Sequence, residues 1–143
     1  MKLWQKICIC IVVLVLLLLN LKAEIIINNA VFDVNLSIFN YEKVKGLGKI
    51  SSIDDNQGML FYYLNSSVRE FWMKDMQFPI DVLWIKDNKI VNISENVPIH
   101  INGEITRMNS LYEVDRVLEL KANSVSKNNI KIGDEIIIKY KLR

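Results

Sequence analysis

The hydrophobic pattern separates an apolar N-terminal segment from a longer region in which short apolar stretches are interrupted by polar residues. From Ile7 to Leu19 every residue is apolar, and this run follows a short basic head. Such an arrangement is typical of an export signal or a signal anchor. As a helix the run spans about 20 Å, less than the roughly 30 Å of hydrocarbon in a membrane. Counted from Leu3 to Leu21, the segment comes close to that length.

Two fates are open to residues 1–23. Ala23 is small enough for a signal-peptidase site, but Leu21 is large where a small residue is preferred. We therefore expect a retained anchor that contacts the membrane through residues 3–21. The alternative is cleavage near Ala23, which would release a secreted or periplasmic domain.

The basic residues predict the orientation of such an anchor. Lys2 and Lys6 precede the apolar run, and Lys22 alone follows it. Because positive charge is retained on the cytoplasmic side, the remaining residues, 24–143, should form one domain on the extracytoplasmic side.

The pattern after this segment predicts mostly strands. Between Phe32 and Ile38 apolar and polar residues alternate, which is the period-2 signal of a half-buried strand. The predicted strands cover residues 25–27, 32–38, 58–64, 68–73, 80–85, 89–97, 117–120 and 136–142, and predicted helical turns cover 40–45 and 123–128. The expected fold class is mainly β (β-rich α+β), with a single curled sheet or small, partly open barrel of about seven strands and one or two short helices.

Two connections between these elements differ in character. Asp87 and Asn88 link the strands 80–85 and 89–97 in the clearest hairpin of the chain. Residues 98–112 show little periodicity and predict a long surface loop, whose length suggests mobility or function.

Composition and charge exclude several classes of site. Cys8 and Cys10 lie inside the apolar run, so the domain has no cysteine for a disulfide or a thiolate-ligated metal. His100 is the single histidine, which excludes a histidine-rich metal site, and we expect neither a metal nor a cofactor. Residues 24–143 contain 15 Lys and Arg against 16 Asp and Glu. Such a near-neutral domain is not expected to bind nucleic acid.

The segment FWMKDMQFPID places charges within a large apolar and aromatic run. Pro79 interrupts strand pairing, so Lys74 and Asp75 should lie at the tip of a connection between two strands. We expect a shallow cleft there with Trp72 as its floor. At the lip of the cleft we expect Lys74, Asp75 and Asp81. The alternative is that Asp81 only ties down the connection by accepting hydrogen bonds from backbone amides.

Glu119 is a second acid in an apolar setting, the predicted strand VLEL. Because an unpaired buried charge is costly, the simplest expectation is a buried ion pair with an arginine. The arginines considered for this pair are Arg69, Arg107 and Arg116. A sharper hypothesis joins Glu119 to Asp81 as the acid and base of a hydrolase, as in glycosidases.

Several of these motifs occur together in a known family. Gly46-Leu47, GMLF, FWMKDMQFPID, VLEL and Gly133-Asp134 closely resemble DUF192, a prokaryotic family of unknown function, over roughly residues 30–140. The matching positions are Gly46, Leu47, Gly58, Met59, Phe61, Trp72, Met73, Pro79, Asp81, Glu119, Gly133 and Asp134. The resemblance implies a compact, strand-rich domain, often behind an export signal, with no established activity.

The chain departs from the family pattern at three places. Gly48 stands where a methionine is common, and Asp75-Met76 replaces Asn-Thr. Asn123 replaces a glycine, although asparagine can still take a left-handed conformation. Asp75 adds a charge where the pattern has an amide, so the ligand need not be the same in every member.

Together these observations predict a membrane-anchored, DUF192-like domain that acts as a non-enzymatic binding or accessory module. The candidate cleft consists of Trp72, Met73, Lys74, Asp75, Pro79, Asp81 and Glu119. One alternative is a small hydrolase acting on envelope glycan, with Asp81 and Glu119 as acid and base. Another is a purely structural module in which the acids are internal ties.

Overall fold

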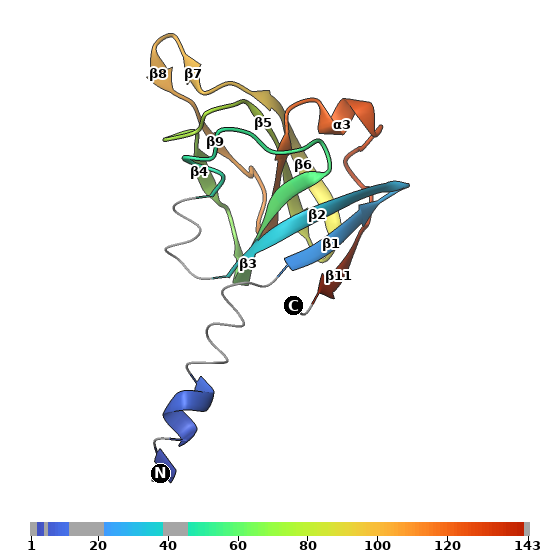
Figure 1. The fold of residues 1–143 in the computed structure, drawn as a ribbon. Helices are drawn as coiled ribbons and strands as arrows, with labels where there is room; N and C mark the ends of the chain where they lie inside the picture. Colours follow the sequence, from blue (N-terminus) through green and yellow to red (C-terminus); the bar gives the residue numbers. More distant parts are fainter. Residues whose placement is uncertain (1–2, 5, 12–21, 39–45, 142–143) are drawn as a thin grey trace.

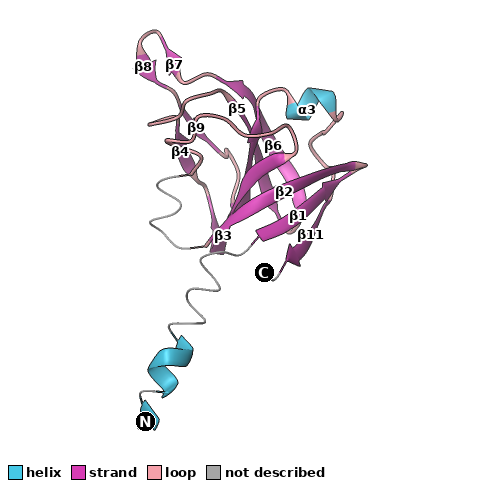
Figure 2. Cartoon of the chain, in the orientation of Figure 1, coloured by secondary structure: helices cyan, strands magenta, loops and turns pink. Residues whose placement is uncertain are grey.

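The computed structural model describes residues 3–4, 6–11, 22–38 and 46–141, and most of them form β-strands (Figures 1 and 2). The elements are β1 Lys22–Ile27, β2 Ala30–Ser37, β3 Gln57–Ser67, β4 Glu70–Trp72, β5 Ile80–Lys86, β6 Lys89–Val97, β7 His100–Ile101, β8 Glu104–Ile105, β9 Arg107–Asn109, β10 Val114–Lys121, the short helix α3 Ser124–Lys127, and β11 Ile136–Lys141. The prediction of a mainly β fold is confirmed.

One seven-stranded sheet dominates the fold, in the order β11-β1-β2-β3-β10-β5-β6. Its neighbouring strands are antiparallel, except that β2 and β3 are parallel. The sheet curls, and its two edge strands approach each other at a single bridge between Lys89 and Glu135. No continuous ladder joins these edges in the described part of the chain, so the sheet is open and does not form a closed barrel.

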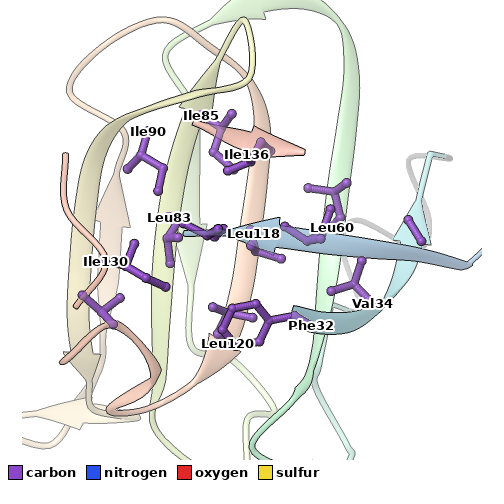
Figure 3. Packing of buried hydrophobic residues seen from close by; sticks show 14 of the residues in the cluster. Phe32, Val34, Leu60, Leu83, Ile85, Ile90, Leu118, Leu120, Ile130 and Ile136 are labelled. Atoms are coloured by element: carbon purple, nitrogen blue, oxygen red, sulfur yellow. The ribbon is translucent and has the colours of Figure 1, made fainter. Parts of the chain in front are cut away.

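The first hydrophobic core contains residues from all seven strands of this sheet (Figure 3). In β10, Leu118 and Leu120 point into it, and Leu83 and Ile85 do so from β5. Phe32 of β2 belongs to the same cluster, and Figure 3 shows it near Leu120. The curled sheet therefore encloses its main core on one face.

A second core covers the other face of the central strands. It consists of Leu47, Phe61, Met73, Met76, Ile80, Val82, Trp84, Val97, Val114 and Val117. Strand β5 contributes to both cores, which explains why the apolar run IDVLWI is buried along its whole length. Two further two-stranded sheets, β4–β9 and β7–β8, complete the fold.

The prediction of a structureless loop over residues 98–112 is wrong, because this stretch contains β7, β8 and β9. Asn102 and Gly103 both have positive φ, 53° and 83°, and form the two-residue turn between β7 and β8. Asparagine followed by glycine is the preferred pair for such a turn. The Asn-Gly pair was therefore the available signal for a hairpin.

The predicted helical turn over residues 123–128 is confirmed by α3. Asn123, which stands where the family has glycine, takes the expected left-handed conformation with φ 71°. The helical turn predicted for residues 40–45 lies outside the described residues.

The predicted anchor is described only in part. Among the described residues, no helix combines the length and the apolar character needed to cross a membrane. Residues 12–21, the greater part of the predicted apolar run, lie outside the described residues. Strand β1 begins at Lys22, two residues before the expected start of the domain.

Candidate functional site

The small sheet β4–β9 has a buried face and an exposed face. Phe71 and Met108 are paired across the two strands and pack against the second core. The Phe71 ring makes edge-to-face contacts with Phe61 and Trp84, with centroid separations of 5.1 and 5.5 Å. Because side chains alternate along a strand, the residues on either side of Phe71 and Met108 point outward.

The outward face carries two cross-strand pairs, Glu70 with Asn109 and Trp72 with Arg107. The Trp72 side chain is 40% exposed, which is unusual for so large an apolar group. The Arg107 guanidinium lies 5.0 Å from the centre of the Trp72 ring, and the Lys74 ammonium lies 5.2 Å from it. These are cation–π distances.

A hollow of about 290 Å³ adjoins this face. Its lining consists of Glu70, Phe71, Trp72, Arg107, Met108 and Asn109. Among the described residues, no carboxylate lies within ion-pair distance of Lys74 or Arg107. An exposed indole and the Arg107 guanidinium therefore line a hollow large enough for a small ligand, and Lys74, just after β4, lies against the same indole.

The turn that follows β4 separates the other predicted cleft residues from this hollow. Met73 is buried in the second core. Asp75 is exposed in a left-handed conformation with φ 61°, and its carbonyl accepts a hydrogen bond from the Lys49 amide at 2.8 Å. Aspartate and asparagine tolerate this conformation better than most residues, which explains why either can occupy the position. Pro79 is exposed, and its carbonyl accepts a hydrogen bond from the Ala122 amide.

Asp81 is fully buried, and both of its carboxylate oxygens are occupied. Oδ1 accepts a hydrogen bond from the Asn96 amide near the end of β6, and Oδ2 accepts one from the Val125 amide in α3, each at 2.8 Å. Two short bonds to backbone amides offset the cost of removing the carboxylate from water. This is the geometry of the structural alternative, in which Asp81 ties elements together away from any cleft.

Glu119 is also buried, with 5% of its surface exposed. Its Oε2 accepts a hydrogen bond from the Leu47 amide at 3.4 Å. Burial raises the pKa of the Glu119 carboxyl to about 7, and the Leu47 amide offsets this only in part. Gly46 adopts φ +49°, and a side chain there would start 3.3 Å from the Glu119 carboxylate.

The expected arginine partner of Glu119 is absent from the described residues. Arg69 donates to the Asn65 carbonyl, Arg116 pairs with Asp115 at 3.2 Å, and Arg107 lies against Trp72. The prediction of an ion pair is therefore wrong for these three arginines. Glu119 instead supports the Gly46–Leu47 connection.

The strand register holds Asp81 and Glu119 apart. Asp81 lies opposite Leu120, whereas Glu119 lies opposite Val82. Directly opposed residues share a face of the sheet, so the two carboxyl groups point to opposite faces. They do not converge on one groove, as an acid–base pair acting on a glycosidic bond must.

Phe71 and Met108 line the hollow but were not part of the expected cleft, and neither were its three charged or amide residues. Glu70 and Asn109 were not considered, and Arg107 was considered only as a partner of Glu119. Two of them belong to β9, within the stretch that was expected to be a loop. Among the described residues, no group of three or more His, Cys, Asp or Glu side chains is arranged to hold a metal ion.

Comparison with known proteins identifies the family of the chain. The family DUF192, uncharacterized ACR, matches residues 23–138. A crystal structure of a proposed transcription regulator from Sinorhizobium meliloti 1021 is similar, with a TM-score of 0.74 and 26% identity over 82% of this chain and 92% of that one. A protein of unknown function from Novosphingobium aromaticivorans DSM 12444 shares the fold, with a TM-score of 0.72 and 24% identity over 81% of this chain and 83% of that one. No curated protein matches the chain. The chain belongs to the DUF192 family.

Proposed function

We propose that this protein is a membrane-anchored, non-enzymatic binding module whose ligand contacts the outward face of β4–β9. The observation that carries the proposal is the exposure of Trp72, which lines the hollow together with Arg107 and has Lys74 against its ring. This site replaces the wider cleft expected from the sequence, since it keeps Trp72 and Lys74 and adds Glu70, Arg107 and Asn109.

Energetics supports a role for Trp72 outside folding. Its sequence neighbour Met73 is buried and Phe71 is half-buried against the second core, so the strand is already held to the domain without the indole. An exposed cation–π contact contributes only about 0.5–1 kcal/mol. Exposed tryptophan and arginine are the residues that most often dominate binding energy at interfaces.

The hollow supports binding better than acid–base chemistry. Glu70 is the single carboxylic acid among its lining residues. The two acids of the hydrolase hypothesis, Asp81 and Glu119, are both buried and lie on opposite faces of the sheet. That geometry gives no support to a hydrolase that uses this pair.

The start of β1 supports the retained anchor over cleavage near Ala23. Lys22 and Ala23 are part of the strand, and Ala23 is fully buried between Val34 of β2 and Tyr140 of β11. Cleavage after Ala23 would remove two paired residues from the domain. Fractionation of cells expressing the full chain should therefore find it in the membrane at close to 16.6 kDa. A shortened, soluble product would contradict the anchor.

The position of the site fits an anchored protein. In Figure 1 the β7–β8 hairpin and the β4–β9 sheet lie toward the opposite end of the domain from the C-terminus. The start of β1 pairs with the end of β11, at the same end as the C-terminus. An anchor preceding β1 would leave the β4–β9 sheet toward the end of the domain away from the membrane, where a ligand on the extracytoplasmic side could reach it.

Charge gives no support for transferring a role in transcription from the similar Sinorhizobium protein to this chain. Residues 24–143 carry 15 Lys and Arg against 16 Asp and Glu. Proteins that bind nucleic acid present a basic face to the phosphates.

A ligand screen with two matched variants tests the proposed function. The full chain in detergent would be screened by thermal shift against glycans, peptides and divalent ions. Tyr140 is 58% exposed on the distant strand β11, so Tyr140→Ala is a control for loss of an exposed aromatic ring. Ligands of the hollow should stabilise wild type and Tyr140→Ala but not Trp72→Ala. Stabilisation that persists in Trp72→Ala would contradict a site on β4–β9.

A further inference from the structure

We propose that the ligand of this hollow is a small carboxylate that also carries an amine or hydroxyl group. The carboxylate would lie against Arg107, within reach of Lys74 on the same indole, and the hydrogen-bond donor would face Glu70. This inference rests on the proposed function and specifies the chemistry of the same site.

The two cations argue for an anion. Four lysines of the domain have acidic partners, such as Lys86 with Glu113 at 3.3 Å and Lys127 with Asp55 at 2.8 Å. Among the described residues, Lys49, Lys89, Lys131 and Lys139 have none but do not lie against the Trp72 ring. Lys74 and Arg107 have none among the described residues, and they converge on the same indole ring. A guanidinium presents paired N–H groups that match the two oxygens of a carboxylate or phosphate.

Glu70 argues for a donor on the same ligand. It lies two residues before Trp72 on β4, so about 7 Å of strand separates it from the indole and its cations. Glu70 also lies directly across from Asn109, and both line the hollow. The Asn109 Oδ1 atom already accepts a hydrogen bond from the Leu111 amide at 3.0 Å, so Glu70 is the acceptor that suits an ammonium or a hydroxyl.

Charge and size favour a carboxylate over a phosphate. Lys74 and Arg107 with Glu70 leave one net positive charge at the site, which balances a monoanion better than a phosphate dianion. The hollow, about 290 Å³, lies at the lower end of the roughly 300–1,000 Å³ typical of ligand pockets. A dipeptide or a single acidic sugar has the right size, and both combine a carboxylate with donor groups.

Matched probe pairs test the inference by fluorescence titration of the full chain in detergent. Alanyl-alanine is compared with its C-terminal amide, and galacturonate with galactose, since each pair differs in the carboxylate. The response should come from Trp72 and disappear in Trp72→Phe, which keeps Trp4 and Trp84. We expect saturable binding at millimolar concentration by a carboxylate probe and none by its neutral partner. The pair that binds identifies the source as a peptide or a sugar acid.

Charge variants complete the test. Arg107→Gln and Lys74→Gln should each weaken carboxylate binding about tenfold or more, because each removes a charge-assisted hydrogen bond. Lys139→Gln, on the distant strand β11, should leave the affinity unchanged. Glu70→Gln should weaken binding of alanyl-alanine more than binding of its N-acetylated form.

Three results would overturn the inference. These are equal binding of charged and neutral partners, binding of inorganic phosphate in preference to every carboxylate, or no saturable response to any carboxylate. Each would leave the proposed function standing as long as some ligand from the broader screen still depends on Trp72. Failure of that dependence would instead reject the site itself.

Discussion

Two regions of the molecule place the same kinds of residue in opposite situations. In the central strands β5 and β10, a tryptophan, Trp84, and two of the three acids, Asp81 and Glu119, are buried. The small β4–β9 sheet holds a tryptophan, Trp72, and an acid, Glu70, on its exposed face. Residue type alone therefore does not distinguish a structural position from a binding position in this fold.

The difference lies in where the polar atoms find their partners. The Trp84 indole donates to the Ser94 hydroxyl at 3.0 Å, and Asp81 is bonded to two backbone amides. At β4–β9, Arg107 and the adjacent Lys74 lie against the Trp72 ring and have no acidic partner among the described residues. Polar groups whose hydrogen bonds are made inside the protein stabilise its fold. Polar groups with unused hydrogen-bonding capacity can instead bind a ligand.

The largest expected effect belongs to Trp84. Trp84→Ala would leave a cavity in the second core, remove the edge-to-face contact with Phe71, and free the Ser94 hydroxyl from its donor. We expect a loss of about 3–5 kcal/mol in the free energy of unfolding. Urea denaturation followed by circular dichroism measures it. A loss below about 1 kcal/mol would mean that the second core is not a tightly packed unit.

Glu119 should make stability depend on pH. Its folded-state pKa of about 7 lies above the ordinary value of 4.5, so the folded protein holds a proton that the unfolded chain releases. The stabilising contribution is fully present below about pH 4.5 and is lost as pH rises through about 7, on the order of 2–3 kcal/mol. Burial raises the pKa of the nearby Tyr63 to about 12, so that group stays neutral over this range.

Glu119→Gln is the control for this dependence, because the amide keeps the shape of the side chain without the titration. The difference in unfolding free energy between wild type and Glu119→Gln, measured by urea denaturation across this pH range, should change in favour of the variant as pH rises. A constant difference would show that Glu119 does not hold a proton in the folded state.

The family motifs predicted which residues are structurally important better than they predicted the interactions that each of these residues makes. Gly46, Leu47 and Glu119 were recognised as motif residues, and they meet in one buried cluster. The apolar neighbours of Glu119 in VLEL indicated that it is buried, but not which group would support its carboxyl. That group is a backbone amide 72 positions away in the sequence, and backbone amides leave no mark in a sequence pattern.

The candidate site was predicted only in part for a related reason. Trp72 and Lys74 were identified because charged residues interrupt a large apolar and aromatic run. Arg107 and Asn109 reach the site through the pairing of β4 with β9, which joins segments far apart in the chain. Such pairing depends on the packing of Phe71 and Met108 against a core that the sequence does not locate.

A smaller effect on stability is expected when each of the two acids of the FWMKDMQFPID segment is replaced by asparagine. Asp81→Asn would place an amide donor against one of two buried backbone amides, at a cost of about 1–3 kcal/mol. Asp75→Asn should be neutral, since asparagine tolerates the left-handed conformation at that exposed turn. Thermal unfolding of the two variants measures the contrast. Equal losses of thermal stability in the two variants would mean that the hydrogen bonds of Asp81 to the two backbone amides do not specifically stabilise the fold.

The smallest effect on stability should come from the site itself. Trp72→Ala removes a side chain that is 40% exposed, together with two surface cation–π contacts of about 0.5–1 kcal/mol each. We expect a loss of no more than about 2 kcal/mol, well below that of Trp84→Ala in the same urea assay. Arg107→Gln should change stability by less, because it removes only one of these contacts. If Trp72→Ala destabilised the protein as strongly as Trp84→Ala, the indole would be part of the folding core. The contrast between the two regions, and with it the case for a binding face on β4–β9, would then fail.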